Sequence, residues 1–115
     1  MSLNFVALGL YAIAAIGGLI MALRAFKGQG SPIMMAILHL GFAGAGSLTL
    51  AAFIFGGAVA TGYTAALACY VLAALGGLYL GSFRFREGFP GTTLIYGHAG
   101  LAVVGTLALV ATSLS

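Results

Sequence analysis

Apolar residues fill four long stretches of this chain, and the charged positions fall between them. The stretches cover about residues 5–23, 33–56, 63–83 and 92–113. A bilayer core about 30 Å thick requires roughly 20 apolar residues in a helix, and each stretch approaches or exceeds this length. Backbone groups in lipid must be hydrogen-bonded internally, so the stretches predict helices, and no period-2 pattern supports strands. We therefore expect an all-α integral membrane four-helix bundle that forms a single transmembrane domain over residues 1–115.

The three linkers between these stretches differ in charge. The first and third contain all the charged residues of the chain, whereas the middle linker and both tails contain none. Basic residues near membrane spans concentrate on the cytoplasmic side. We therefore expect both charged linkers in the cytoplasm and both termini outside, in the inner membrane of a bacterium. The charged residues are Arg24, Lys27, Arg84, Arg86 and the only acid, Glu87.

Composition supports the membrane interpretation and narrows the classes of function. Hydrophobic residues make up 63% of the chain and charged residues 4%, whereas soluble domains contain about 25% charged residues. The net charge of +3 comes from four cations and one anion, which gives no reason to expect nucleic-acid binding. The sequence also lacks a nucleophile–base pair, a phosphate-binding loop and a dinucleotide fingerprint. The lipid bilayer is therefore the first partner that we expect.

The chain matches itself when it is shifted by 59 residues. Residues 3–56 then align with residues 62–115 without a gap, and the only two histidines, His39 and His98, fall on each other. Each unit is a helical hairpin, so we predict two tandem parallel repeats related by a pseudo-twofold axis along the membrane normal. Both histidines should then lie at one depth, roughly 9 Å from the cytoplasmic starts of their helices. Other identical pairs include Tyr11 with Tyr70 and Gly17-Gly18 with Gly76-Gly77.

The two histidines are the strongest candidates for a functional site. Ionisable side chains inside a membrane usually face the interior of the bundle. If the second and fourth helices lie on a diagonal, their axes are roughly 11–14 Å apart, which suits two imidazoles with a metal between them. Small residues beside both histidines predict a flat apolar slot, as a haem with two axial imidazoles requires. These residues are Ala43, Gly46, Ala102 and Gly105.

We therefore predict one haem b with His39 and His98 as its iron ligands. Its propionates require cations at the membrane edge, and all basic residues of the chain lie on the side that we assign to the cytoplasm. Arg24 and Arg84, together with Lys27 and Arg86, are the candidate partners of the propionates.

On the basis of these two histidines and the four-helix plan, the chain resembles the b561-like group of membrane b-type cytochromes. In that group, axial histidines come from paired helices of a small bundle. The resemblance implies that His39 and His98 hold haem and that the chain relays electrons. The group typically binds two haems through a second histidine pair, which this chain lacks. We therefore expect an electron-transfer subunit that works with other membrane subunits, a second copy of itself or a quinone.

Two other functions remain open at this stage. The histidines can be structural, hydrogen-bonded to Tyr11, Tyr70 or a carbonyl, in a non-catalytic accessory subunit of a larger membrane complex. A small solute or ion transporter is the other alternative. Small multidrug transporters rely on a membrane carboxylate, and the only acid here, Glu87, lies in a linker. The paired glycines are typical of close helix packing.

Overall fold

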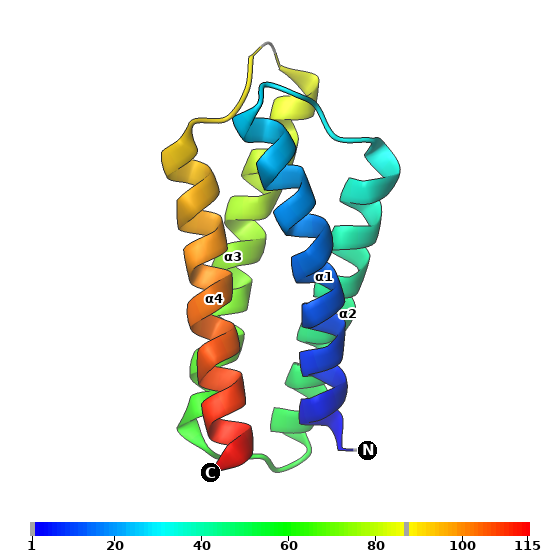
Figure 1. Ribbon diagram of the computed structural model, residues 1–115. Coiled ribbons are helices and arrows are strands. Elements are labelled where there is room, and N and C mark those ends of the chain that lie inside the picture. The colour runs from blue at the N-terminus through cyan, green and yellow to red at the C-terminus, as the bar shows by residue number, and fades with distance from the viewer. Residues whose placement is uncertain (1, 87) are drawn as a thin grey trace.

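The computed structural model describes residues 2–86 and 88–115, and four long helices account for most of them (Figure 1). The prediction of an all-α chain with four long apolar helices is confirmed, with ends that differ by a few residues from the predicted spans. Each helix is long and apolar enough to cross a membrane, so the bundle is compatible with an integral membrane protein. The helices are α1 (Leu3–Phe26), α2 (Ile33–Phe55), α3 (Thr61–Ser82) and α4 (Thr92–Leu114), with a 3-10 turn η1 (Phe83–Phe85) after α3.

The first helix extends further than the apolar pattern predicts. We expected α1 to end before Arg24, but the helix continues to Phe26. A basic side chain in the last turn is favourable because it faces the negative end of the helix dipole. The Arg24 Nε donates a hydrogen bond to the carbonyl oxygen of Gly30 at 2.9 Å. Gly28 then turns the chain with a φ of +69°, a backbone conformation that favours glycine. Glu87 lies outside the described residues.

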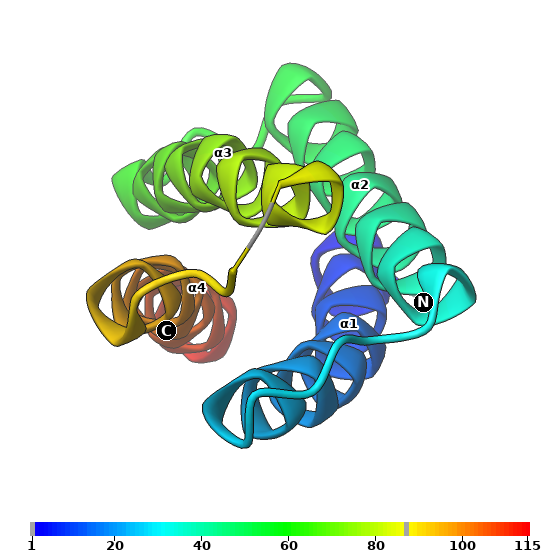
Figure 2. The ribbon, with the colours of Figure 1, turned by 90° about the horizontal axis from the view of Figure 1, so that it is seen from above.

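The helices form two antiparallel pairs that lie side by side. Seen along the bundle in Figure 2, α1 is next to α2 and α3 is next to α4, and α1 and α3 occupy one diagonal. Packing is closer within each pair than between the pairs. Both chain ends and residues 56–60 lie at one end of the bundle, here called the terminal end (Figure 1). The other two linkers lie at the opposite end, the linker end.

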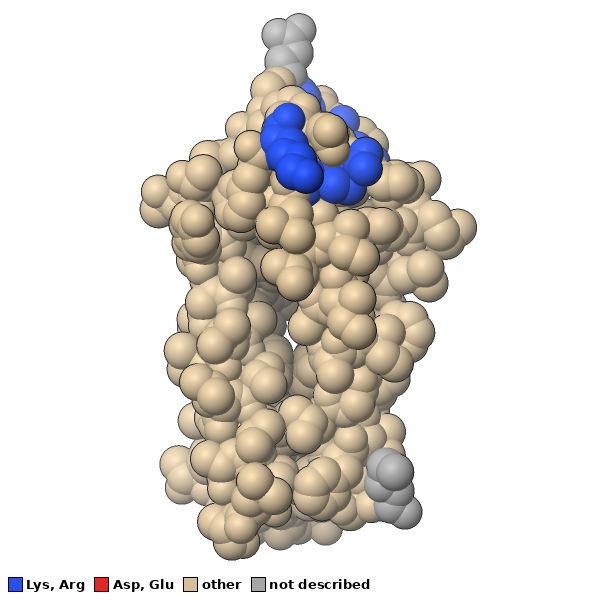
Figure 3. Space-filling model, in the orientation of Figure 1, with Lys and Arg blue, Asp and Glu red and all other residues tan. Residues whose placement is uncertain are grey.

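The charged side chains of the described residues lie at the linker end. The lysine and arginine side chains visible in Figure 3 gather there, and the remainder of that face carries no blue or red atoms. Arg24 is half-buried, and the other three basic side chains, Lys27, Arg84 and Arg86, are exposed. Arg86 lies over the rings of Tyr79 and Phe83, with 5.1 Å from its guanidinium carbon to each ring centre.

The buried core lies in the half of the bundle near the terminal end. Most large apolar side chains face outward, as expected where lipid and not water surrounds the helices. Among the described residues, α1 contains no buried residue beyond Ala14, and α3 contains none beyond Ala73. Figure 3 shows the surface hollowed near mid-height between the two helix pairs. Ile95 on α4 is the one described residue that is buried toward the linker end, so the bundle buries more side chains near the terminal end than near the linker end. The core cluster is Ala7, Tyr11, Leu50, Ala66, Tyr70 and Leu109.

Candidate functional site: a histidine pair above a tyrosine pair

Each histidine is held by a backbone carbonyl of the neighbouring helix. The Nδ1 of His39 on α2 lies 2.8 Å from the carbonyl oxygen of Ala14 on α1. The Nδ1 of His98 on α4 lies 2.7 Å from the carbonyl oxygen of Ala73 on α3. A carbonyl oxygen only accepts hydrogen bonds, so Nδ1 is the donor in both contacts. In the neutral imidazole, the lone pair that can bind a ligand is then on Nε2, and this holds for both histidines.

Glycine residues make these contacts possible. Within a helix, the carbonyl of residue 14 is bonded to the N–H of residue 18, and only its second lone pair remains free for the imidazole. A Cβ atom on Gly18 would lie 2.9 Å from Cε1 of His39, and one on Gly77 would lie 2.8 Å from Cε1 of His98. Any larger residue at these two positions would therefore push the imidazole away from the carbonyl.

The two imidazoles face each other across the bundle. Their ring centres are 6.1 Å apart, and the ring planes are inclined by 72°. Two imidazoles on opposite sides of one metal ion, with metal–nitrogen bonds of about 2 Å, have ring centres roughly 6 Å apart. The structure thus brings the rings of His39 and His98 together at a spacing similar to that of two imidazoles that share a metal ion.

A pair of stacked tyrosines lies next to the histidines along the bundle. The rings of Tyr11 on α1 and Tyr70 on α3 are 3.6 Å apart between centres and inclined by 12°. Tyr11 precedes Ala14 by three residues, which places it roughly 4.5 Å nearer the terminal end. The tyrosine contact crosses one diagonal of the bundle and the histidine contact crosses the other. The tyrosine pair therefore closes the terminal side of the histidine pair.

The tyrosine hydroxyls are part of two short hydrogen-bond chains. Ser47 donates to the carbonyl of Ala43 at 3.0 Å, and its oxygen is 2.8 Å from the Tyr11 hydroxyl. Because the serine hydrogen is already used, Tyr11 is the donor to Ser47. The same reasoning makes Tyr70 the donor to Thr106, at 2.6 Å, because Thr106 donates to the carbonyl of Ala102. Both tyrosine hydroxyls are thereby satisfied away from water.

The small residues predicted to form a slot contact the tyrosines instead of open space. A Cβ atom on Gly46 would lie 3.1 Å from the Tyr11 ring, and one on Gly105 would lie 3.4 Å from the Tyr70 ring. Ala43 and Ala102 provide the carbonyls that accept from the hydroxyl chains. The sequence pattern did not show this, because helical side chains lean toward the N-terminus and bring the tyrosines over these glycines. The more open side of the histidine pair faces the linker end.

The predicted propionate partners are at that more open end. Arg24 follows Ala14 by ten residues and so lies roughly 15 Å along α1 from the histidine contact. Arg84 follows Ala73 by eleven residues and lies in the 3-10 turn η1, beyond the end of α3 at Ser82. The structure thus keeps these cations separate from the histidines and places them beyond the open side.

Several residues of the site were missed by sequence reasoning. Gly18 and Gly77 were interpreted as general packing glycines, although each is required beside an imidazole. Ser47 and Thr106 were not recognised, because their residue types differ. The 59-residue shift aligns these two hydroxyl residues with each other. A comparison of the repeats that treated serine and threonine as equivalent would have found them.

The described part of the chain brings no group of three or more His, Cys, Asp or Glu side chains together. The histidine pair therefore offers two protein ligands.

No family model, curated protein or solved structure matches the chain.

Proposed function

We propose that the chain is a subunit of a membrane b-type cytochrome that binds one haem b through His39 and His98. The observation that carries this proposal is the matched orientation of the two imidazoles, each bonded through Nδ1 to a carbonyl and 6.1 Å apart between ring centres. Histidine ligands of metals usually donate their other ring N–H in this way, which fixes the ring and leaves Nε2 for the metal. A bound haem supplies reversible one-electron transfer, here to or from a partner subunit or a quinone.

The remaining residues of the site have supporting roles in this function. The carbonyls of Ala14 and Ala73 orient the imidazoles, and the stacked tyrosines exclude water from the terminal side. Arg24 and Arg84, with Lys27 and Arg86, provide positive charge at the membrane edge for the haem propionates. His39 and His98 would hold the haem iron, and the stacked rings of Tyr11 and Tyr70 would bound the site on its terminal side.

The proposal includes a tandem repeat and a membrane orientation. Residues 3–56 and 62–115 are two parallel hairpins related by a pseudo-twofold axis along the membrane normal. Matched burial supports this: both Tyr11 and Tyr70 are 6% exposed, and both Ala14 and Ala73 are 4% exposed. The basic linker end faces the cytoplasm of a bacterium and the termini lie outside. A single haem on the cytoplasmic side relays electrons on that side and does not conduct them across the whole membrane.

A structural role for the histidines is the second candidate. Each imidazole bonds only to the other helix of its own pair, His39 to α1 and His98 to α3. The same hydrogen bonds would therefore stabilise two hairpins in an accessory subunit that binds no haem.

The visible spectrum of the purified protein distinguishes these two functions. Protein from haem-replete cells should show the sharp reduced α-band of a low-spin b-type haem. His39→Ala and His98→Ala should each lose haem or become high-spin, and to a similar extent, because their environments match. Tyr11→Phe, which keeps the ring stack, is the control that should retain the band. A wild-type protein without haem, or histidine variants with an unchanged spectrum, would leave the structural role as the explanation.

A further inference from the structure

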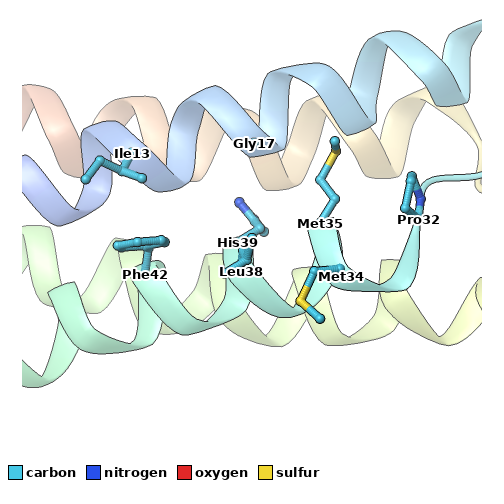
Figure 4. Close-up of a pocket in the computed structure, with 8 residues that line it drawn as sticks. All are labelled: Ile13, Gly17, Pro32, Met34, Met35, Leu38, His39 and Phe42. Atoms are coloured by element: carbon cyan, nitrogen blue, oxygen red, sulfur yellow. The ribbon is translucent and has the colours of Figure 1, made fainter.

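An apolar groove runs along the outer surface between α1 and α2. It has a volume of about 400 Å³, more than ten times the roughly 30 Å³ that a water molecule occupies in the liquid. Figure 4 shows His39 pointing from α2 toward α1 between the walls of the groove. The imidazole is the only polar side chain among the lining residues, and its Nδ1 is already bonded to Ala14. The groove therefore offers an apolar surface and suits a hydrocarbon chain. Its lining includes Ile13, Pro32, Met34, Leu38 and Phe42.

One end of the groove lies at a linker that carries positive charge. Pro32 lines the groove and is the last residue before α2, so that end lies at the linker between α1 and α2. Lys27 is exposed at the start of this linker. Arg24 is tied to the linker by its hydrogen bond to the carbonyl of Gly30. An apolar groove that ends at a linker with two cations is complementary to an acyl chain that lies below a phosphate.

We propose that this groove binds an anionic phospholipid, with an acyl chain along Leu38 and Phe42 and the headgroup phosphate beside Lys27 and Arg24. Anionic headgroups attract basic side chains at the membrane surface. A charged surface alone attracts anionic lipids without binding them at one place, whereas the groove offers a single place for the acyl chain. The groove shares His39 with the proposed haem site, and Arg24 and Lys27 are also the proposed partners of the propionates. The lipid preference is measured on haem-free protein, so its result does not depend on whether the chain binds haem.

The second hairpin provides an internal comparison. At the positions shifted by 59 residues, Gly91, Thr93 and Gly97 replace Pro32, Met34 and Leu38. These residues are small or polar and offer less apolar surface for a chain. Arg86 on that hairpin is already packed over two aromatic rings. The binding should therefore be specific to the first hairpin, although both hairpins carry basic residues at the same end.

The chain contains no tryptophan, so a single introduced tryptophan can report on nearby lipid by its quenching with brominated acyl chains. Met34→Trp places the reporter in the groove, and Thr93→Trp places it at the matched position of the second hairpin. Each variant is reconstituted in vesicles that contain brominated phosphatidylglycerol or brominated phosphatidylcholine. We expect phosphatidylglycerol to be preferred about fivefold at position 34, and much less at position 93.

Charge variants in the Met34→Trp background complete the test. Lys27→Gln should remove most of the preference and Lys27→Glu should reverse it. Arg86→Gln, which removes the same charge from the same end of the bundle, should leave the preference unchanged. Equal quenching by both lipids at position 34 would overturn the proposal. An equal preference at both positions, or an equal effect of Lys27→Gln and Arg86→Gln, would also overturn it, because general attraction to the basic end would then explain the binding.

Discussion

Replacing Gly18 by alanine should disturb one imidazole without removing it. The new Cβ would lie 2.9 Å from Cε1 of His39, a separation that real Cβ atoms essentially never show. The imidazole must therefore move, and its 2.8 Å hydrogen bond to the carbonyl of Ala14 is lost or lengthened. Gly17→Ala is the matched control, because its Cβ would make an ordinary 3.8 Å contact with Cβ of His39.

The expected magnitude follows from three contributions. Either alanine should stabilise the helix by about 1 kcal/mol relative to glycine. Only Gly18→Ala loses a hydrogen bond, which contributes about 0.5–1.5 kcal/mol, and forces a side chain out of place, which costs about 1–3 kcal/mol. We therefore expect Gly18→Ala to be less stable than Gly17→Ala by roughly 1.5–4.5 kcal/mol.

Reversible unfolding in mixed detergents would measure this difference, and nitrogen NMR of the imidazoles would show its cause. Wild type and Gly17→Ala should both show Nδ1 protonated at His39. Gly18→Ala should lose that signature at His39 and retain it at His98, which serves as an internal control. Gly77→Ala and Gly76→Ala repeat the comparison on the second hairpin. Equal stability of Gly17→Ala and Gly18→Ala, together with an unchanged His39 signal, would refute the argument that residue 18 must be glycine to admit the imidazole.

Three further predictions concern the tyrosines and the membrane orientation. Tyr11→Phe removes the hydroxyl bonded to Ser47 but keeps the ring stack, so the free energy of unfolding should fall by about 1 kcal/mol. This loss should not add to the loss caused by Ser47→Ala. Full additivity in the double variant would mean that the two hydroxyls do not interact. Gly46→Ala places a Cβ 3.1 Å from the rigid Tyr11 ring and should destabilise the protein by about 1–3 kcal/mol. Gly44→Ala is the control and should not destabilise it, because its Cβ would have nothing within 4 Å. Equal effects of the two variants would contradict the observed packing. In a Cys69→Ala background, cysteine at Ala58 should react with an impermeant reagent from outside intact cells and cysteine at Gln29 should not, and labelling of position 29 from outside would reverse the proposed orientation.

The four helices could be predicted from the sequence because apolar length dominates the free energy of a helix in lipid. The charged residues indicated where two of the linkers lie, but they did not indicate at which residue a helix ends. Arg24 bounds the first stretch, yet α1 continues through Phe26 because a basic residue is favourable in a last helical turn. The start of α2 at residue 33 was predicted correctly, since Pro32 restricts the backbone before it.

The site was predicted only in part. The sequence singled out His39 and His98 and indicated that they would share a depth, and the structure places the two rings 6.1 Å apart. It did not indicate how they are held, because a backbone carbonyl leaves no mark in the sequence. The glycines at positions 46 and 105 suggested open space, but space in a bundle depends on which large side chains of the other helices reach it. Here Tyr11 and Tyr70 reach those glycines, and their stacking across the bundle depends on the relative position of two separate helices.

Titration of the haem-free protein with ferric haem tests the central claim most directly. We expect the absorption spectrum to change saturably at one haem per chain, and the bound haem to be low-spin if both imidazoles bind its iron. Under the same conditions, His39→Ala and His98→Ala should bind more weakly and give a high-spin spectrum. A titration without saturation, or a bound haem whose spin state does not depend on either histidine, would contradict the assignment of His39 and His98 as axial ligands.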